Sequence, residues 1–443
     1  GWFAVNGMKK ILIAACCLLL LAAGWLAALF SKTDADRQAE LLAAAQSYLD
    51  DGIYVKAAPL LEQAAGYSAK HTLEAEEKLK EAYAPLLEQS GYARKYTGLL
   101  DKQMAREDCA PDVYLEAARY YLEHSKESNA FAALRTGIEK TGSRELTDFY
   151  EANRYAYDAG YAAYQEVTDF LNGYIQVRQD GYWGLASASG SLALPCEYES
   201  LTTCWNGEAV IRRDGVVSGI DLDGNRVALY KGDPVRETTN FNENRLCLHL
   251  EDGWVLATGE LTTGQDVFEA LGAFSDGGAA AKQNGKWGVI GRNGVDWLVE
   301  PSYDGVACDG LGRCWYDGTV FVRDSDGFYL LADGQRIAGP YEDAQPFAGG
   351  WAAVKKDGKW GYIDREGAER IGFRFENARS FTMHLAAVET ARGWGYVGLD
   401  GTLVIDPVFL DAKAFSDGTA PVKTADGWQF ITLLEYKTGI SGL

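Results

Sequence analysis

The chain has 443 residues, a formal charge of −21 and 47% hydrophobic residues, so it is long enough for two or three domains with separate cores. Neutralising nucleic-acid phosphates requires a basic surface, and this acidic balance therefore argues against a nucleic-acid partner. Fifty glycines beside 25 tyrosines and 12 tryptophans are typical of a protein with many short strands and tight turns.

The first predicted element is an uncharged stretch of twenty residues, 11–30. At about 1.5 Å per residue it forms a helix of about 30 Å, which matches the hydrocarbon core of a bilayer. Lys9 and Lys10 precede it, so the positive-inside rule places residues 1–10 in the cytoplasm and the bulk of the chain outside. We therefore expect a single-pass protein of the cell membrane. A cleaved signal peptide and a lipid anchor at Cys16 are the alternatives.

Residues 34–172 are predicted to be helical, because alanine, leucine, glutamate and lysine recur there with helical period. Three helix-turn-helix units follow one another, with turns at Gly52, at Gly91 and near Lys126. Units of this length, with small residues where the helices cross, resemble the tetratricopeptide family. That resemblance implies an α-solenoid of stacked units whose concave surface binds a protein or peptide, with a rigid stalk as the alternative.

Residues 174–443 form the predicted β domain, in which two-residue alternation replaces the helical period. In the clearest unit, short strands at 352–355, 360–364 and 371–375 are separated by turns at Asp357-Gly358 and Glu366-Gly367. Asp-Gly and Glu-Gly supply the positive φ angles that tight hairpins require. The unit therefore reads as three strands joined by two tight turns.

The same unit recurs about eight times. Turn glycines stand at positions 181, 215, 253, 285, 327, 358, 393 and 427, spaced by 31 to 42 residues. The most faithful copies contain Trp287, Trp360 and Trp394, each followed by glycine, and this pattern resembles the WG, or KWG, repeat family of bacterial type. The resemblance implies a β-repeat architecture without assigned chemistry. Eight units of two to four strands close most simply into a β-propeller-like ring, with an open β-solenoid as the alternative.

Two sets of tryptophans receive different interpretations. An inward-pointing tryptophan on a short strand buries roughly 150–250 Å², and a glycine beside it lets another backbone approach closely. We therefore assign four tryptophans to the core of the repeats: Trp183, Trp287, Trp360 and Trp394. Four others are candidate ligand-binding residues that would stack on sugar rings: Trp205, Trp297, Trp315 and Trp351.

No pattern in the chain points to catalysis, a metal or a cofactor. The four histidines are isolated from one another, and phosphate-binding loops and nucleophile elbows are absent. The segment from Asp221 to Gly224 imitates part of a calcium loop without its full ligand set, and a hairpin turn explains it better. Cys308 and Cys314 are close enough in sequence to pair in an exported domain. We expect no catalytic residue, no metal and no cofactor.

These features together predict a multidomain α+β protein with a transmembrane helix, a tetratricopeptide-like α-solenoid and an all-β array of WG repeats. We expect a membrane-anchored, extracytoplasmic interaction or scaffolding module with a protein or peptide partner and no enzymatic activity. Binding of a cell-wall glycan or another carbohydrate is the first alternative. An enzyme with an acidic site in the β domain is the second, and it requires converging carboxylates with perturbed pKa values.

Overall fold

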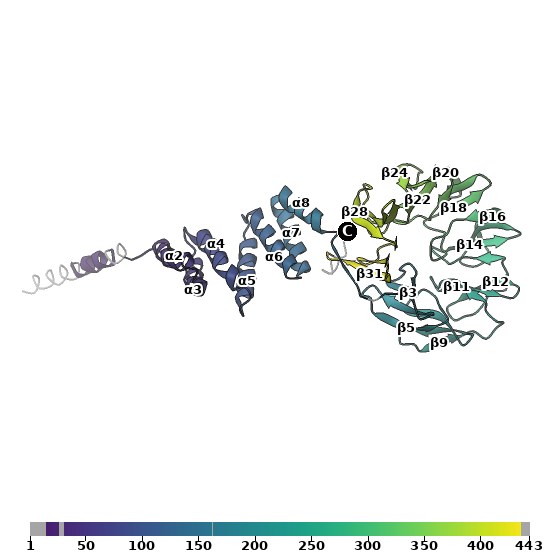
Figure 1. Cartoon of the computed structure of the whole chain (residues 1–443), viewed down its shortest axis with the longest axis horizontal. Coiled ribbons are helices and arrows are strands. Elements are labelled where there is room, and N and C mark those ends of the chain that lie inside the picture. The colour runs from purple at the N-terminus through teal and green to yellow at the C-terminus, as the bar shows by residue number, and fades with distance from the viewer. Residues whose placement is uncertain (1–14, 26–30, 162, 436–443) are drawn as a thin grey trace, which may run out of the picture. The chain divides into compact units, whose positions relative to one another are not determined.

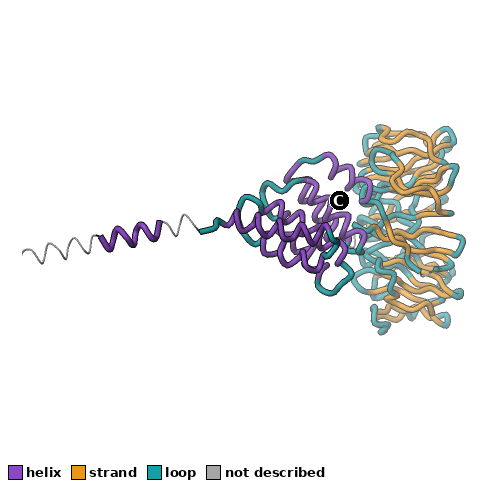
Figure 2. Tube along the Cα trace, turned by 60° about the vertical axis from the view of Figure 1, so that its left-hand side comes forward, coloured by secondary structure: helices purple, strands orange, loops and turns teal. Residues whose placement is uncertain are grey.

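A computed structural model of the chain describes residues 15–25, 31–161 and 163–435. The chain divides into two compact units. The first holds the described residues up to 124 together with residues 132–147, and the second holds residues 125–131 and the chain from 148 onward. Helices make up most of the first unit and strands most of the second (Figure 2). The predicted order of a helical region followed by a β region is therefore confirmed.

Only part of the predicted membrane segment is described. Residues 15–25 are helical, and their leucines and Trp25 are exposed. Among the described residues, no helix is both long enough and apolar enough to cross a membrane. The transmembrane helix predicted for residues 11–30 therefore finds no support in the described part of the chain, and the rest of that segment lies outside it.

The helical region contains seven α-helices and one short 3₁₀ helix between residues 31 and 161. They are α2 (Asp34–Asp50), α3 (Tyr54–Ala65), α4 (Thr72–Tyr83), η1 (Ala84–Leu86), α5 (Tyr92–Met104), α6 (Pro111–Glu123), α7 (Glu127–Thr141) and α8 (Arg144–Asn153). The three predicted helix-turn-helix units correspond to α2–α3, α4–α5 and α6–α7. Gly52 and Gly91 at the first two turns have φ angles of 70° and 89°, which glycine adopts without steric cost.

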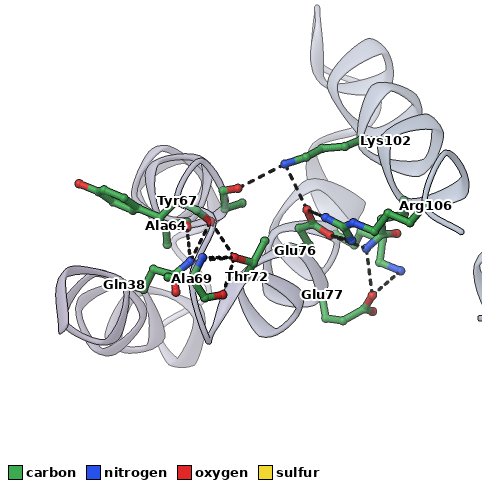
Figure 3. A network of polar contacts seen from close by, with 12 residues as sticks. Gln38, Ala64, Tyr67, Ala69, Thr72, Glu76, Glu77, Lys102 and Arg106 are labelled. Carbon is green, nitrogen blue, oxygen red and sulfur yellow. Dashed lines mark hydrogen bonds and ion pairs between the residues drawn. The ribbon is translucent and has the colours of Figure 1, made fainter. Parts of the chain in front are cut away.

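Two buried polar side chains connect successive helices of the first unit (Figure 3). Gln38 on α2 is fully buried, and its amide nitrogen donates hydrogen bonds to the carbonyl oxygens of Ala64 and Tyr67. Glu76 on α4 is also fully buried, and both terminal nitrogens of Arg106 donate to it at 2.7 and 2.6 Å. These contacts satisfy groups that would otherwise be costly to bury, and they connect α2 to the end of α3 and α4 to the segment after α5.

The pKa of Glu76 links this network to pH. Burial raises that pKa, but Arg106 and Lys102 lower it more, so the pKa lies below its ordinary value of 4.5 in the folded protein. Stability from the ionised carboxylate is fully present above the unfolded-state pKa and is lost as the pH falls through the folded-state pKa. We expect the difference in melting temperature between the wild type and Glu76→Gln to shrink below about pH 4.5, as measured by helical circular dichroism. A difference that stays constant to the lowest pH would contradict this assignment.

The second unit is a ring of eight small antiparallel sheets, an eight-bladed β-propeller (Figure 1). The prediction of eight repeats closing into a ring is thus confirmed, and the open β-solenoid is excluded. In most blades a two-residue strand lies innermost and a strand of four to seven residues lies outermost.

The strands of each blade follow one another in the chain, except in blade 8. Blade 1 contains β2 (Glu166–Val167), β3 (Tyr174–Gln179), β4 (Tyr182–Ser187) and β5 (Leu192–Tyr198); blade 2 contains β6 (Ser200–Leu201), β7 (Glu208–Arg213), β8 (Val216–Asp221) and β9 (Arg226–Leu229); blade 3 contains β10 (Glu237–Thr238), β11 (Arg245–Leu250) and β12 (Gly253–Thr258); blade 4 contains β13 (Ala270–Leu271), β14 (Gly278–Gln283), β15 (Lys286–Gly291) and β16 (Trp297–Tyr303). Blade 5 contains β17 (Gly305–Val306), β18 (Thr319–Asp324), β19 (Gly327–Ala332) and β20 (Gln335–Tyr341); blade 6 contains β21 (Asp343–Ala344), β22 (Trp351–Lys356), β23 (Lys359–Asp364) and β24 (Glu369–Phe375); blade 7 contains β25 (Asn377–Ala378), β26 (Ala386–Thr390), β27 (Gly393–Val397) and β28 (Leu403–Phe409); blade 8 contains β29 (Asp411–Ala412), β30 (Thr419–Thr424), β31 (Gly427–Leu433) and β1 (Tyr157–Ala159).

The ring is closed by a strand from the other end of the propeller sequence. β1 pairs antiparallel with β31, so residues preceding blade 1 complete blade 8. This closure covers an edge of blade 8 that would otherwise be open to association. It also moves the start of the β region upstream of the predicted boundary at residues 172–174, because β1 and β2 precede it. Strands of two or three residues are too short to produce a detectable alternation in the sequence.

The tryptophan of each faithful repeat lies near the start of the third strand of its blade. Trp360 and Trp394 are buried, as predicted, while Trp183 and Trp287 are partly buried against the cores of their blades. The following glycine allows close contact with the outer strand: a Cβ atom on Gly395 would lie 2.5 Å from the carbonyl oxygen of Ile405. The pairing register shifts at this point, so the outer strand bulges against the glycine.

Two buried tyrosines connect neighbouring blades. The hydroxyl of Tyr362 in blade 6 donates to the carbonyl oxygen of Arg379 in blade 7 at 2.8 Å. The hydroxyl of Tyr396 in blade 7 makes the equivalent bond to Lys413 in blade 8 at 2.7 Å. Both acceptors follow the innermost strand of their blade, so these bonds hold the backbone that faces the axis of the ring.

Candidate ligand-binding site

One connection between the innermost strand and the next differs from all the others. Between β17 and β18 of blade 5 it has twelve residues, whereas the other seven blades use six or seven. The six additional residues are 308–313. They contribute to the longest spacing in the repeat pattern, the 42 residues between Gly285 and Gly327. We call residues 308–313 the plug loop.

The plug loop crosses the centre of the ring. It leaves blade 5, and its Gly310 lies against the carboxylate of Asp169 in blade 1, on the opposite side: a Cβ atom there would be 2.4 Å from an oxygen of Asp169. The carbonyl oxygen of Leu311 accepts a hydrogen bond from the side chain of Asn240 in blade 3, and that of Gly312 accepts one from the backbone of Ala273 in blade 4. Contacts with blades 1, 3 and 4 mean that the loop fills the middle of the axial channel.

The plug loop is held in shape by one carboxylate. One oxygen of Asp309 accepts hydrogen bonds from the backbone nitrogens of Leu311 and Arg313. The other accepts from the Arg313 guanidinium at 3.0 Å and from the Tyr316 hydroxyl at 2.9 Å. Burial, with Asp309 adding to it, raises the pKa of Tyr316, so its hydroxyl stays protonated as the donor of this bond. Four hydrogen bonds to one side chain therefore define the conformation of the loop.

On one side of the plug loop lies a cavity of 420 Å³. It is bounded by blade 1, by the plug loop, and by the connections after the innermost strands of blades 6, 7 and 8. Its charged residues are Asp169, Asp309, Arg313 and Arg379, and Ser380, Thr382 and Ser416 add hydroxyl groups. We call it the axial pocket. Its volume is in the range of small-molecule and peptide side-chain sites.

Charged groups at the axial pocket form three ion pairs of different quality. Arg313 is hydrogen-bonded to Asp309, and Arg379 to Asp411 at 2.8 Å. The third pair is loose, because the Lys413 ammonium lies 3.9 Å from the nearest oxygen of Asp169, beyond hydrogen-bond range. Within the described residues no hydrogen-bond donor reaches the Asp169 carboxylate. Asp169 is therefore the open acceptor of the pocket.

A second hollow of 330 Å³ shares part of the wall of the axial pocket. Tyr316, Phe347 and Ala348 line both, and the second hollow extends to Arg365 and the double glycine at Gly349-Gly350. Most other blades carry Asp-Gly or Asn-Gly at the position of this double glycine. The two hollows therefore adjoin at this wall, over blades 5 and 6.

The four predicted ligand-binding tryptophans do not gather at one place. All are partly buried, and each packs against a different hydrophobic cluster: Trp205 between blades 2 and 3, Trp297 between blades 3 and 4, Trp315 between blades 4 and 5, and Trp351 between blades 6 and 7. They provide no shared stacking platform.

The remaining sequence motifs have structural roles. Asp221 accepts hydrogen bonds from the backbone of Asp223 and Asn225, so it caps its own turn. Cys308, the first residue of the plug loop, and Cys314, which follows the loop, are free thiols. In the described ranges no three His, Cys, Asp or Glu side chains cluster as metal ligands would.

Sequence reasoning missed the residues that line the axial pocket. Asp169, Arg313 and Arg379 lie in connections far apart in the chain, and only the ring brings them together. The plug loop, by contrast, left a signal, because the 42-residue spacing marks blade 5 as the unit with an insertion.

Comparison with protein families finds matches within the second unit. Segments 161–183, 267–287, 341–360, 360–390 and 394–428 match the family described as WG containing repeat. They fall in blades 1, 4, 6, 7 and 8. The resemblance to WG repeats inferred from the sequence is confirmed for these segments.

Solved structures similar to this chain share little sequence with it. They include Hsv2 of Kluyveromyces lactis, 9% identical, covering 61% of this chain and 98% of that one with a TM-score of 0.36. Apo AztD of Citrobacter koseri is 14% identical, covering 58% and 87% with a TM-score of 0.34. YCF48 bound to a D1 peptide is 11% identical, covering 61% and 97% with a TM-score of 0.32. No curated protein matches the chain.

Proposed function

We propose that the C-terminal propeller, five segments of which match the WG containing repeat family, is an interaction module that binds a peptide segment of a partner protein in the axial pocket. The observation that carries this proposal is the plug loop. A six-residue insertion in one blade of eight fills the middle of the channel and leaves a walled cavity on one side of it. The loop is held in one conformation by its own hydrogen bonds, so we infer that it forms part of a binding site.

The chemistry of the pocket favours binding over catalysis. The two carboxylates that line it are Asp169 and Asp309. Asp309 accepts hydrogen bonds from four donors of the protein itself, so Asp169 has no second open carboxylate in the pocket to work with it in acid–base catalysis. The second hollow, which adjoins the pocket and extends to Arg365, offers a peptide further surface beyond the pocket, and peptide binding at such surfaces needs few polar anchors.

A pocket-filling substitution tests the proposal. Ala414 lines the axial pocket in blade 8, and Ala425 is exposed in the turn at the other end of β30 in the same blade. We expect Ala414→Trp to abolish enrichment of sequences from a random-peptide display library on the purified full-length chain in detergent, since the indole occupies the cavity. Ala425→Trp adds the same ring to the same blade and should enrich the same sequences as the wild type. Equal enrichment on all three proteins would contradict a site in the axial pocket.

We also propose that residues 11–30 anchor the chain in the cell membrane, with residues 1–10 in the cytoplasm and the remainder extracytoplasmic. The uncharged stretch and the lysines before it, Lys9 and Lys10, support this. Protease added to intact cells should then degrade the helical region and the propeller while an epitope at the N-terminus stays protected. Protection of the whole chain would contradict this topology.

A further inference from the structure

We infer that the axial pocket selects a basic side chain of its peptide ligand, a lysine or an arginine, through the carboxylate of Asp169. The inference rests on the proposed peptide-binding function and names the chemistry of the residue that enters the pocket.

The first argument is the inventory of groups that the protein leaves unmatched. Asp309 accepts four hydrogen bonds, and Arg313 and Arg379 each have a carboxylate of the protein as partner, although the buried Nε of Arg379 has no hydrogen-bond partner. Asp169 alone lines the cavity with no hydrogen bond to its carboxylate within the described residues. A partly buried carboxylate without donors is costly, and a ligand that brings N–H donors removes that cost.

The second argument is the looseness of the one cation near Asp169. The ammonium of Lys413 stands 3.9 Å away and also lies 5.3 Å from the centre of the Trp428 ring, so it is shared between two weak contacts. Its side chain does not line the cavity, whereas that of Asp169 does. An incoming cation therefore meets the carboxylate first and need not displace a hydrogen bond.

The third argument is the charge of the protein. With a formal charge of −21, the chain attracts basic segments and repels acidic ones before contact. The two arginines at the pocket do not reverse this, because each is paired with an aspartate. Long-range and local electrostatics thus favour the same class of ligand.

Two substitutions with opposite expected effects test the inference. Asp169→Asn keeps the shape of the side chain but removes its charge, and it should weaken a lysine- or arginine-containing peptide selected on the wild type by at least tenfold, since one hydrogen bond to a charged group contributes that much. Lys413→Gln removes the competing cation and should tighten binding of the same peptide several-fold. Asp417→Asn serves as the control, because it removes one negative charge from an exposed turn of the neighbouring connection and should leave affinity within about twofold. Affinities are measured by calorimetric titration of the full-length chain.

The outcomes separate this inference from the proposed function. Enrichment of lysine or arginine on the wild type, lost on both Asp169→Asn and Ala414→Trp, supports both. Ala414→Trp keeps the net charge, so enrichment that persists on it is nonspecific attraction and overturns both. Peptides that lose binding on Ala414→Trp but lack a basic residue, or are indifferent to Asp169→Asn, overturn the inference and leave the proposed function intact. Equal weakening by Asp169→Asn and Lys413→Gln would assign the pair a purely structural role.

Discussion

Replacing Gly395 with alanine is expected to destabilise the propeller by about 3 kcal/mol or more, because the added methyl group would overlap backbone atoms of the neighbouring strand. Its Cβ atom would lie 2.5 Å from the carbonyl oxygen of Ile405 and 2.8 Å from the backbone nitrogen of Pro407. Both neighbours are backbone atoms of the outer strand of blade 7, so neither can move aside as a side chain would. The melting temperature of the β signal should fall by roughly 6–12 °C.

Gly398 offers a matched control three residues further along the same blade. A Cβ atom there would meet its nearest neighbours, in Asp400 and Val404, at 3.6 and 3.8 Å, which is ordinary van der Waals contact. Gly398→Ala should therefore change the melting temperature little. If Gly395→Ala and Gly398→Ala had the same melting temperature, the bulged outer strand would not require the glycine of the repeat. Our explanation of the Trp-Gly pair would then be wrong.

The second large effect is expected in the helical unit, where Arg106→Met should cost about 3 kcal/mol. The substitution leaves the carboxylate of Glu76, which is fully buried, with only Lys102 at 3.2 Å as a charged partner. Denaturation followed by helical circular dichroism should show a fall in melting temperature of roughly 10 °C. Lys95→Met removes an exposed ion pair with Glu62 and should cost less than about 1 kcal/mol.

A double substitution distinguishes the buried charge from simple loss of packing. Adding Glu76→Leu to Arg106→Met removes the stranded carboxylate and should recover much of the lost stability, since apolar replacements of buried ion pairs are often neutral or better. If the double variant were less stable than Arg106→Met, the cost would come from lost contacts of the arginine side chain rather than from an unpaired buried charge.

The repeats of the propeller could be predicted because each carries its own local signal. In blade 6, for example, the Asp357-Gly358 turn and the Trp360-Gly361 pair lie within fifteen residues of each other. Both are required by the packing of strands that are adjacent in the chain, so the signal is local. The closing strand β1 could not be predicted, because its partner β31 lies more than 260 residues away and three residues hold no periodicity. The same reason hid the innermost strands, which have only two residues each.

The candidate site was less predictable than the fold, because its members share no local pattern. Asp169 and the plug loop meet only because blades 1 and 5 stand opposite each other in a closed ring of eight. Sequence patterns also gave no sign that Trp205 and Trp351 are partly buried between neighbouring blades. The insertion in blade 5, in contrast, could be found by comparing repeat lengths, because the 42-residue spacing between Gly285 and Gly327 is longer than any other in the array.

The central claim is that a peptide binds in the axial pocket, and the most direct test is to map which part of the propeller a bound peptide contacts. Ser416 lines the axial pocket in the connection before β30 of blade 8, and Ala425 lies in the turn after β30, at the other end of that strand. A photoreactive p-benzoylphenylalanine is placed at either position of the full-length chain, and peptides recovered from the library are cross-linked and identified by mass spectrometry. A site in the axial pocket predicts cross-links from position 416 and none from position 425. Cross-links from position 425 alone, or equally from both, would contradict it.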